Sequence, residues 1–305
     1  MPEPFLRCGR YSLPLGGKTY VMAIVNITDD SFAGGGFLGD HDEALRHALR
    51  FAEEGADIID VGGESARTET PLVSAEEEIE RVVPLIERLA AEIDIPISVD
   101  SFKGEVAEAA LQAGASIVND IAGFTMGGGT ARAAAKHDAG FVINYTTNPP
   151  KVRLPEPPAY NDVVGQHLDV LRERIERARQ LGVSEETIIV DPGIAFGKSH
   201  DEDLEVLRHL EQFRSLGRPL LLAPSRKHVI GAVLADEHGT ALPPEGRLEG
   251  TAAVLALAVA HGVDIVRVHD VREMARVTRM ADAIVRGRRG DFAATRESWP
   301  WPGRR

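Results

Sequence analysis

One kind of segment recurs along the chain: a short run rich in β-branched residues that ends in a polar side chain, followed by Gly or Pro and then by a helical stretch. Eight such runs occur at regular spacing, at residues 20–27, 57–61, 96–99, 116–118, 140–143, 187–190, 219–222 and 264–268. Runs of this length that are apolar nearly throughout are typical of strands buried on both faces, as in a parallel sheet covered by helices. The repetition therefore predicts a (β/α)8 TIM barrel.

The segments between the runs have the pattern of helices. They cover residues 42–54, 75–92, 103–113, 162–181, 201–213, 250–261 and 271–286. Several of them end at a glycine, which is the usual residue just beyond a helix C-terminus. In a (β/α)8 barrel the reacting groups lie at the carboxyl ends of the strands, so the polar residues that end the runs should meet at one mouth.

We expect a single domain in three parts. Residues 1–19, with a turn at Leu15-Gly16-Gly17-Lys18, look like a hairpin that plugs the barrel floor. Residues 20–287 form the barrel, whose usual length of about 250 residues fits this range. Residues 288–305 are polar, with two tryptophans between prolines, and are expected to be a mobile C-terminal tail.

Composition restricts the classes of function. No apolar run approaches the ~18 residues of a membrane span, and no charged-then-apolar leader starts the sequence. One cysteine, Cys8, allows no intrachain disulfide and fits a reducing cytoplasm. The net charge of -13 disfavours a nucleic-acid surface. We therefore expect a cytoplasmic protein without a nucleic-acid or membrane partner, in which a local basic cluster serves to bind an anion.

Two strand ends carry the residues best suited to chemistry. Asp191 is followed by a glycine loop that would let a ligand approach the backbone, although an Asp at a strand end often only caps the next helix. Arg267 and His269 alternate with apolar residues, so both should face the barrel lumen. A buried arginine needs an anion or a flat π-system beside it, and the alternative is an internal salt bridge with Asp191 or Asp100.

Several motifs spaced along the chain, taken in order, indicate a protein family. They are Asn26-Ile27-Thr28-Asp29-Asp30-Ser31-Phe32, Asp60-Val61-Gly62-Gly63-Glu64-Ser65-Ala66-Arg67, Ser98-Val99-Asp100-Ser101, Val118-Asn119-Asp120-Ile121, Asp191-Pro192-Gly193-Ile194-Ala195-Phe196-Gly197-Lys198, Ser225-Arg226-Lys227, Arg247-Leu248-Glu249-Gly250-Thr251 and Arg267-Val268-His269-Asp270-Val271. Each is weak alone, but the ordered set resembles the dihydropteroate synthase family over nearly the whole chain. These folate-pathway transferases join a dihydropterin pyrophosphate to p-aminobenzoate and release pyrophosphate.

The resemblance implies a role for each matching residue in reading the pterin. Asp191 and Asn119, with Asp100 nearby, would accept from and donate to the aminopyrimidinone edge. Lys227 would donate to the ring, and Arg267 would stack its guanidinium on the pterin face. Gly193 and Phe196, from the loop after Asp191, are also assigned to substrate binding.

The same resemblance implies a site for the leaving group and for the second substrate. Asn26, Arg67 and His269 would hold the pyrophosphate, with Mg2+ bridging Asn26 and the phosphates. Ser225 would contact the carboxylate of p-aminobenzoate. Lys227, Arg67, His269 and Asp100 are the expected catalytic residues. A homodimer is expected because the 250–261 helix is apolar nearly all round and similar proteins pair through their last helices.

The departures from the family pattern concern the half of the site that receives the amine. Asp29 and Gly34 stand where the family has Pro and Asp, Ala66 stands where it has Thr, and Asn144-Tyr145-Thr146-Thr147 replaces a Met-His-Met segment. Two other readings therefore stay open. One is a paralogue that binds pterin but uses another amine acceptor or lacks turnover, and the other is a pterin-dependent methyltransferase, against which the Ser225-Arg226-Lys227 and Arg267-Val268-His269 motifs argue.

Overall fold

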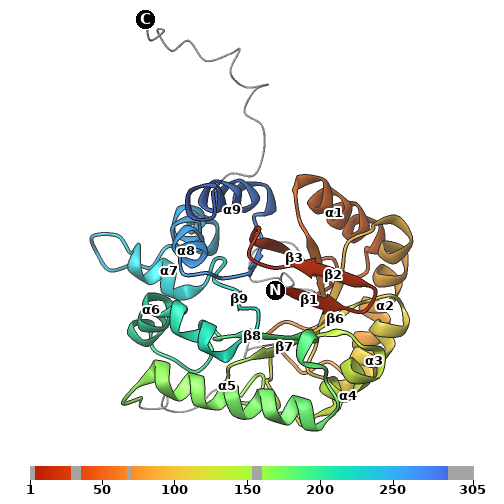
Figure 1. Ribbon diagram of the computed structural model, residues 1–305. Helices are drawn as coiled ribbons and strands as arrows, with labels where there is room; N and C mark the ends of the chain where they lie inside the picture. Colours follow the sequence, from red (N-terminus) through yellow and green to blue (C-terminus); the bar gives the residue numbers. More distant parts are fainter. Residues whose placement is uncertain (1–3, 29–35, 67–69, 153–159, 288–305) are drawn as a thin grey trace, which may run out of the picture.

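A ring of parallel strands surrounded by helices forms the body of the molecule (Figure 1). The computed structural model describes residues 4–28, 36–66, 70–152 and 160–287. Its strands are β1 (Phe5–Cys8), β2 (Tyr11–Pro14), β3 (Tyr20–Asn26), β4 (Ile58–Gly62), β5 (Ile97–Asp100), β6 (Ile117–Asp120), β7 (Gly140–Asn144), β8 (Ile188–Asp191), β9 (Leu221–Leu222) and β10 (Ile265–Val268). Its α-helices are α1 (His41–Glu54), α2 (Ala75–Glu92), α3 (Gly104–Gln112), α4 (Gly129–His137), α5 (Val163–Gln180), α6 (His200–Arg208), α7 (His228–Val233), α8 (Leu248–Ala260) and α9 (Val271–Val285).

The eight-stranded sheet has the order β8-β7-β6-β5-β4-β3-β10-β9, and all neighbouring pairs are parallel. A parallel bridge between Val190 and Leu220 brings the two outer strands together and closes the ring. The prediction of a (β/α)8 barrel is therefore confirmed. Among the described residues, no helix is both long enough and apolar enough to span a membrane.

Helices α1, α2, α5 and α6 begin where a short polar side chain can satisfy a first backbone N–H group. Asp40, Ser74, Asp162 and Ser199 accept hydrogen bonds at the starts of α1, α2, α5 and α6, and Ser199 forms a full capping box with Glu202. The predicted 201–213 helix is instead α6 followed by a 3-10 helix at Leu210–Leu216. Helices α4 and α7 were not predicted: α4 has no capping side chain at its start, and α7 has only six residues.

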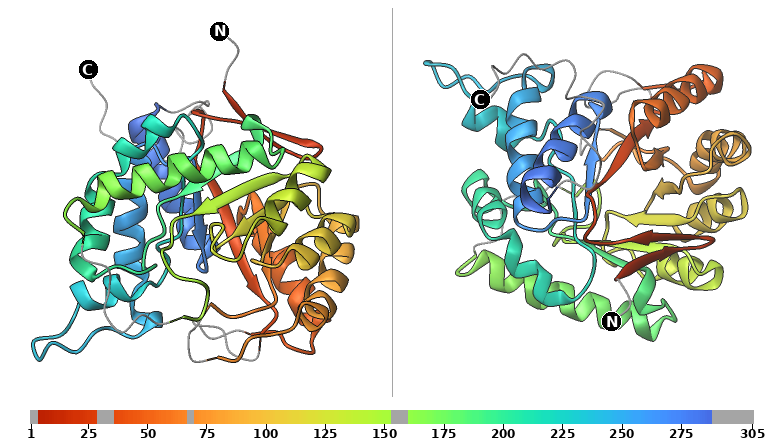
Figure 2. Two further views of the ribbon diagram at one scale, coloured as in Figure 1. Left: turned by 90° about the horizontal axis from the view of Figure 1, so that it is seen from below. Right: turned by 45° about the horizontal axis from the view of Figure 1, so that its top comes forward.

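The β1-β2 hairpin closes one end of the barrel. Its Leu6 and Cys8 side chains are fully buried and pack against Met22, Ile58, Ile117, Val142, Ile189, Leu221 and Ile265, which point inward from the strands. Burial raises the pKa of the Cys8 thiol to about 12, so it stays protonated and packs as an apolar group. The hairpin lies at the opposite end of the molecule from the segment joining α7 and α8 (Figure 2, left).

Candidate active site

The side chains that point into the barrel lie in layers along its axis, and they change from apolar in the first layer to mainly polar in the second. The floor layer holds the apolar residues that contact the hairpin. Because side chains alternate along a strand, the residue two positions later faces the lumen again. That next layer contains Asp60, Ser98, Asn119, Asn144, Asp191 and Arg267. The same rule places the apolar Ile24 and Ala223 in this layer, so the barrel has an apolar floor with a mainly polar ring of side chains directly above it.

A cavity of about 260 Å³, which we call the central cavity, lies above this polar ring. Its lining includes most of the predicted site residues: Asn26, Asp100, Ser225, Lys227, Arg267 and His269. Glu64, Ser65, Ala66, Ala195, Ala223, His228 and Ile24 complete the wall. Strand register explains this convergence, because Asn26 pairs with Gly62, Gly62 with Asp100, and Asp100 with Asn119.

Arg267 is held by two carboxylates. Its Nε donates to Asp60 Oδ2 at 2.6 Å and its Nη2 to Asp100 Oδ2 at 2.5 Å. Of the two candidate salt bridges weighed from the sequence, the one with Asp100 is present, and among the described contacts the one with Asp191 is not. Asp60 was not predicted as a partner. It is fully buried, and the alternation that placed Arg267 in the lumen also identifies Asp60, two residues after the inward-facing Ile58.

Asn119 and Asp191 belong to the same polar ring but are not among the residues that line the central cavity. Asn119 donates to Asp60 Oδ2 at 3.3 Å, and Asp191 Oδ1 accepts from the Gly193 backbone N–H at 2.7 Å. Gly193 has a φ of +68°, and a Cβ there would lie 2.0 Å from the Tyr145 carbonyl oxygen, so only glycine fits. The Lys227 ammonium lies 4.7 Å from the centre of the Phe196 ring, which completes this side of the site.

Three buried polar atoms of this ring have no hydrogen-bond partner within the part of the chain that the structure describes. They are Asp60 Oδ1, Ser98 Oγ and Asn144 Oδ1. A buried polar group without a partner costs about 1–3 kcal/mol. Their position in a polar ring below an open cavity indicates a site for a ligand that has several donors and acceptors.

Burial and the local charges set the protonation of the ring. Burial raises the pKa of Asp100 to about 7 and that of Asp191 to about 6, although nearby Arg267 or Lys227 act in the opposite direction. The pKa of Lys227 is lowered, first by burial and then by Arg267. Burial thus favours the neutral forms of Asp100, Asp191 and Lys227, whereas for Arg267 burial is outweighed by the neighbouring carboxylates, which raise its pKa. Shifted pKa values are common at sites of binding and catalysis.

His269 and Ser225 form a pair at the mouth of the ring. The Ser225 Oγ accepts from the His269 backbone N–H at 3.1 Å and lies 3.0 Å from His269 Nδ1. Burial, followed by the neighbouring Arg267, Arg226 and Lys227, lowers the pKa of His269 to about 3. The imidazole is therefore neutral at physiological pH and offers hydrogen bonds rather than charge.

Asn26, the residue expected to bind Mg2+, lies in the wall of the central cavity. Its side chain lines the central cavity and makes no hydrogen bond with another described residue. Within the described ranges, no group of three or more His, Cys, Asp or Glu residues could hold a metal ion alone. One amide oxygen completed by substrate phosphates and water is a donor set that suits Mg2+. The donor chemistry of Asn26 is therefore compatible with one ligand of such an ion.

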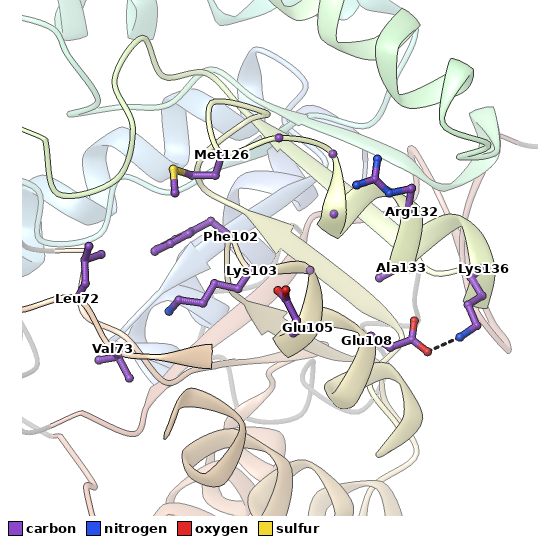
Figure 3. Close-up of a pocket in the computed structure, with 14 residues that line it drawn as sticks. Leu72, Val73, Phe102, Lys103, Glu105, Glu108, Met126, Arg132, Ala133 and Lys136 are labelled. Carbon is purple, nitrogen blue, oxygen red and sulfur yellow. Dashed lines mark hydrogen bonds and ion pairs between the residues drawn. The ribbon is translucent and has the colours of Figure 1, made fainter. Parts of the chain in front are cut away.

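Some of the predicted residues lie outside the described parts of the chain, and another hollow lies away from the predicted site. Arg67, Asp29, Gly34 and the 288–305 tail lie outside the described residues. A larger hollow of about 750 Å³ lies along α3 and α4, and Glu108 of α3 pairs with Lys136 of α4 at its edge (Figure 3). None of the predicted site residues lines it.

Comparisons with known proteins agree with this arrangement. Residues 22–269 match the family described as pterin binding enzyme. The chain is 46% identical to dihydropteroate synthase of Bacillus subtilis over 88% of this chain and 89% of that protein. The Yersinia pestis dihydropteroate synthase structure with a sulfonamide drug has a TM-score of 0.85 at 35% identity, covering 92% of this chain and 98% of that one. A Xanthomonas albilineans dihydropteroate synthase with 4-aminobenzoic acid has a TM-score of 0.82 at 39% identity, with the same coverage. The chain belongs to the dihydropteroate synthase family of pterin-binding enzymes.

Proposed function

We propose that this protein is a dihydropteroate synthase, which condenses 6-hydroxymethyl-7,8-dihydropterin pyrophosphate with p-aminobenzoate and releases pyrophosphate. The observation that carries the proposal is the central cavity, where Asp100, Lys227, Arg267 and His269 meet above a ring of buried polar atoms. A pterin has a flat ring and a polar edge, so it matches both features. No comparison favours another acceptor or a methyltransferase.

The pterin is read by the polar ring. Asp191 and Asn119 face the aminopyrimidinone edge, and a carboxylate and an amide suit its donors and acceptors. Lys227 donates to a ring oxygen or nitrogen. Arg267 presents its planar guanidinium to the ring face, while Asp60 and Asp100 fix the plane of that guanidinium. Gly193 and Phe196 shape the wall behind Asp191 and Lys227.

The methylene–oxygen bond breaks, and its electron pair leaves on pyrophosphate. The amine nitrogen of p-aminobenzoate then forms the new carbon–nitrogen bond, and its N–H bond breaks as the proton passes to water or to the released pyrophosphate. Asn26, Arg67 and His269 hold the leaving group, and bound Mg2+ would neutralise its growing charge. Ser225 contacts the carboxylate of the acceptor. Positioning and electrostatic stabilisation carry such a step, so the protein need not supply a nucleophile.

Pyrophosphate release measured with and without p-aminobenzoate tests the function. We expect release that depends on p-aminobenzoate and on added Mg2+, with formation of dihydropteroate in equal amount. If pyrophosphate release does not depend on p-aminobenzoate and no dihydropteroate forms, the result would favour a paralogue with another acceptor. Activity retained in full after removal of divalent metal would remove Mg2+ from the proposal.

We also propose a homodimer built on α8 and α9. These helices pack together, and their outer surfaces expose Leu257, Met280, Ile284 and Val285. The exposed face of α8 contains the small apolar residues Ala253, Ala256 and Ala260 beside Leu257. Exposed apolar side chains gathered on two packed helices are typical of an interface between subunits. The single buried Cys8 accords with a cytoplasmic location, which we propose as well.

Light scattering at micromolar concentration should give the mass of a dimer. Changing Leu257 and Ile284 together to Glu should give a monomer, because two charges would be buried at the twofold interface. Met126→Glu is the matched control, since Met126 is also exposed but lies beside the hollow between α3 and α4. A monomeric wild-type protein would refute the dimer.

A further inference from the structure

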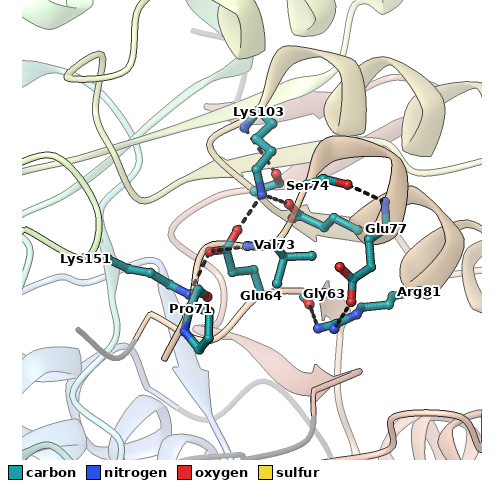
Figure 4. Close-up of polar contacts among 11 residues, drawn as sticks. Gly63, Glu64, Pro71, Val73, Ser74, Glu77, Arg81, Lys103 and Lys151 are labelled. Carbon is teal, nitrogen blue, oxygen red and sulfur yellow. Dashed lines mark hydrogen bonds and ion pairs between the residues drawn. The ribbon is translucent and has the colours of Figure 1, made fainter. Parts of the chain in front are cut away.

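A buried cluster of charges joins three connections at the carboxyl ends of the strands (Figure 4). At its centre is Glu64, two residues beyond β4, whose side chain is only 3% exposed. Glu64 Oε1 contacts Lys151 Nζ at 2.7 Å and accepts from the Val73 backbone N–H at 3.3 Å, and Glu64 Oε2 pairs with Lys103. Lys103 also pairs with Glu78 of α2. Both oxygens of Glu64 are therefore fixed.

Lys151 comes from a distant part of the barrel. It lies in the connection between β7 and α5, and two strands, β5 and β6, separate β7 from β4 in the sheet. Its ammonium contacts Glu64 and also donates to the carbonyl oxygen of Pro71. It thereby ties together the two ends of the connection that follows β4. Its side chain is 6% exposed, so this contact is shielded from water and salt.

The backbone of Lys151 supports a specific role for this contact. Its φ is +61°, a left-handed conformation that a residue with a Cβ adopts only at a cost. Such a conformation persists where surrounding contacts hold it. The charges of the cluster also balance, with Glu64 and Glu78 opposite Lys103 and Lys151. Loss of Lys151 would leave one buried negative charge without compensation.

The held segment is part of the site. Glu64, Ser65 and Ala66 line the central cavity together with Ser225 and His228. Arg81 adds support from α2, because its Nη1 donates to the carbonyl oxygen of Gly63 at 2.9 Å. A shift of Glu64 would therefore move the cavity wall, while Asp191 and Asn119 are outside that lining and are held by other partners.

We propose that Lys151 is a positioning residue that fixes the Glu64–Ala66 wall of the central cavity and so sets the affinity for p-aminobenzoate. The proposal rests on the proposed function for the identity of the acceptor. It concerns the position of a wall, and Lys151 itself contacts no reacting atom. Charge, rather than bulk, is the property of Lys151 that matters.

Lys151→Met tests this directly, because it keeps the length of the side chain and removes the charge. We expect the KM for p-aminobenzoate to rise about tenfold. The affinity for 6-hydroxymethylpterin, measured by calorimetry, should stay within about twofold. Amide hydrogen exchange of residues 64–66 should become faster. Lys151→Arg should restore the KM to within about threefold of wild type. Lys136→Met is the control, since Lys136 also pairs with a glutamate but is exposed and lies outside the central cavity.

The readouts separate the two proposals. If the wild-type protein does not use p-aminobenzoate, the proposed function fails, and hydrogen exchange of residues 64–66 alone then decides the role of Lys151. Unchanged exchange in Lys151→Met would overturn the proposal. It would also be overturned if the variant lost thermal stability without a change in KM, or if Lys151→Arg behaved like Lys151→Met.

Discussion

Replacing Asp191 by Asn should nearly abolish pterin binding while making the fold more stable at alkaline pH. The pterin edge loses a charged acceptor, and hydrogen bonds to a charged group contribute about 1.5–3 kcal/mol each. The expected loss of affinity is roughly a hundredfold or more. Stability moves in the opposite direction, because burial makes the charged carboxylate costly in the folded state.

The pH dependence of this gain has a definite sign. The pKa of Asp191 in the folded protein is about 6, above the usual value for an unfolded chain, so the fold is stabilised by protonation and loses that stabilisation as the pH rises through 6. Asn carries no charge at any pH. The free energy of unfolding of Asp191→Asn should therefore exceed that of wild type by about 1–3 kcal/mol at pH 8, and by less at pH 5.

Calorimetric titration with 6-hydroxymethylpterin and urea unfolding at both pH values measure the two effects. Asp94→Asn is the matched control, since Asp94 is almost fully exposed and should change neither quantity. Unchanged pterin affinity in Asp191→Asn would remove Asp191 from the site. A variant less stable than wild type at pH 8 would show that the neighbouring lysines more than offset the cost of burying this carboxylate.

The barrel and most of the site could be predicted because both follow from alternation along short strands. The rule that brought Arg267 and His269 to one face also places Asn26, Asp100 and Asn119 in the lumen. Applied to the strand 57–61 it would have identified Asp60, which forms a 2.6 Å contact with Arg267. Asp60 was not predicted as a partner of Arg267 because the prediction considered the polar residues that follow this strand, whereas Asp60 lies within it.

Other features could not follow from periodicity. The pairing of Lys151 with Glu64 joins residues of two connections, and no repeat in the sequence encodes the path of a connection across the barrel mouth. Helix α4 begins with glycines and lacks a capping side chain, so its start carries no local signal. Such elements are stabilised by packing in the finished barrel rather than by their own sequence pattern.

Replacing Arg267 by Met should lower kcat/KM by about a hundredfold to a thousandfold, which corresponds to ~3–4 kcal/mol of transition-state stabilisation. The variant loses a flat cation against the pterin ring, and it also leaves Asp60 and Asp100 without the charge that separates them. Two carboxylates that share a site cannot both stay ionised at little cost. The effect should therefore appear in the pH profile as well as in the rate.

The direction of the pH effect distinguishes this role from simple packing. Arg267 lowers the pKa of Asp100, which burial has already raised to about 7. Without Arg267 the pKa of Asp100 should rise further, so the acidic limb of the profile of kcat/KM should move to higher pH. Arg267→Lys should return that limb toward its wild-type position, because it restores the charge, but should recover little of the rate, because an ammonium cannot stack or bridge both carboxylates in the same way. A profile that stays in place in Arg267→Met would show that Asp100 does not need to be ionised for the reaction, and the catalytic role would then rest with Lys227 and His269.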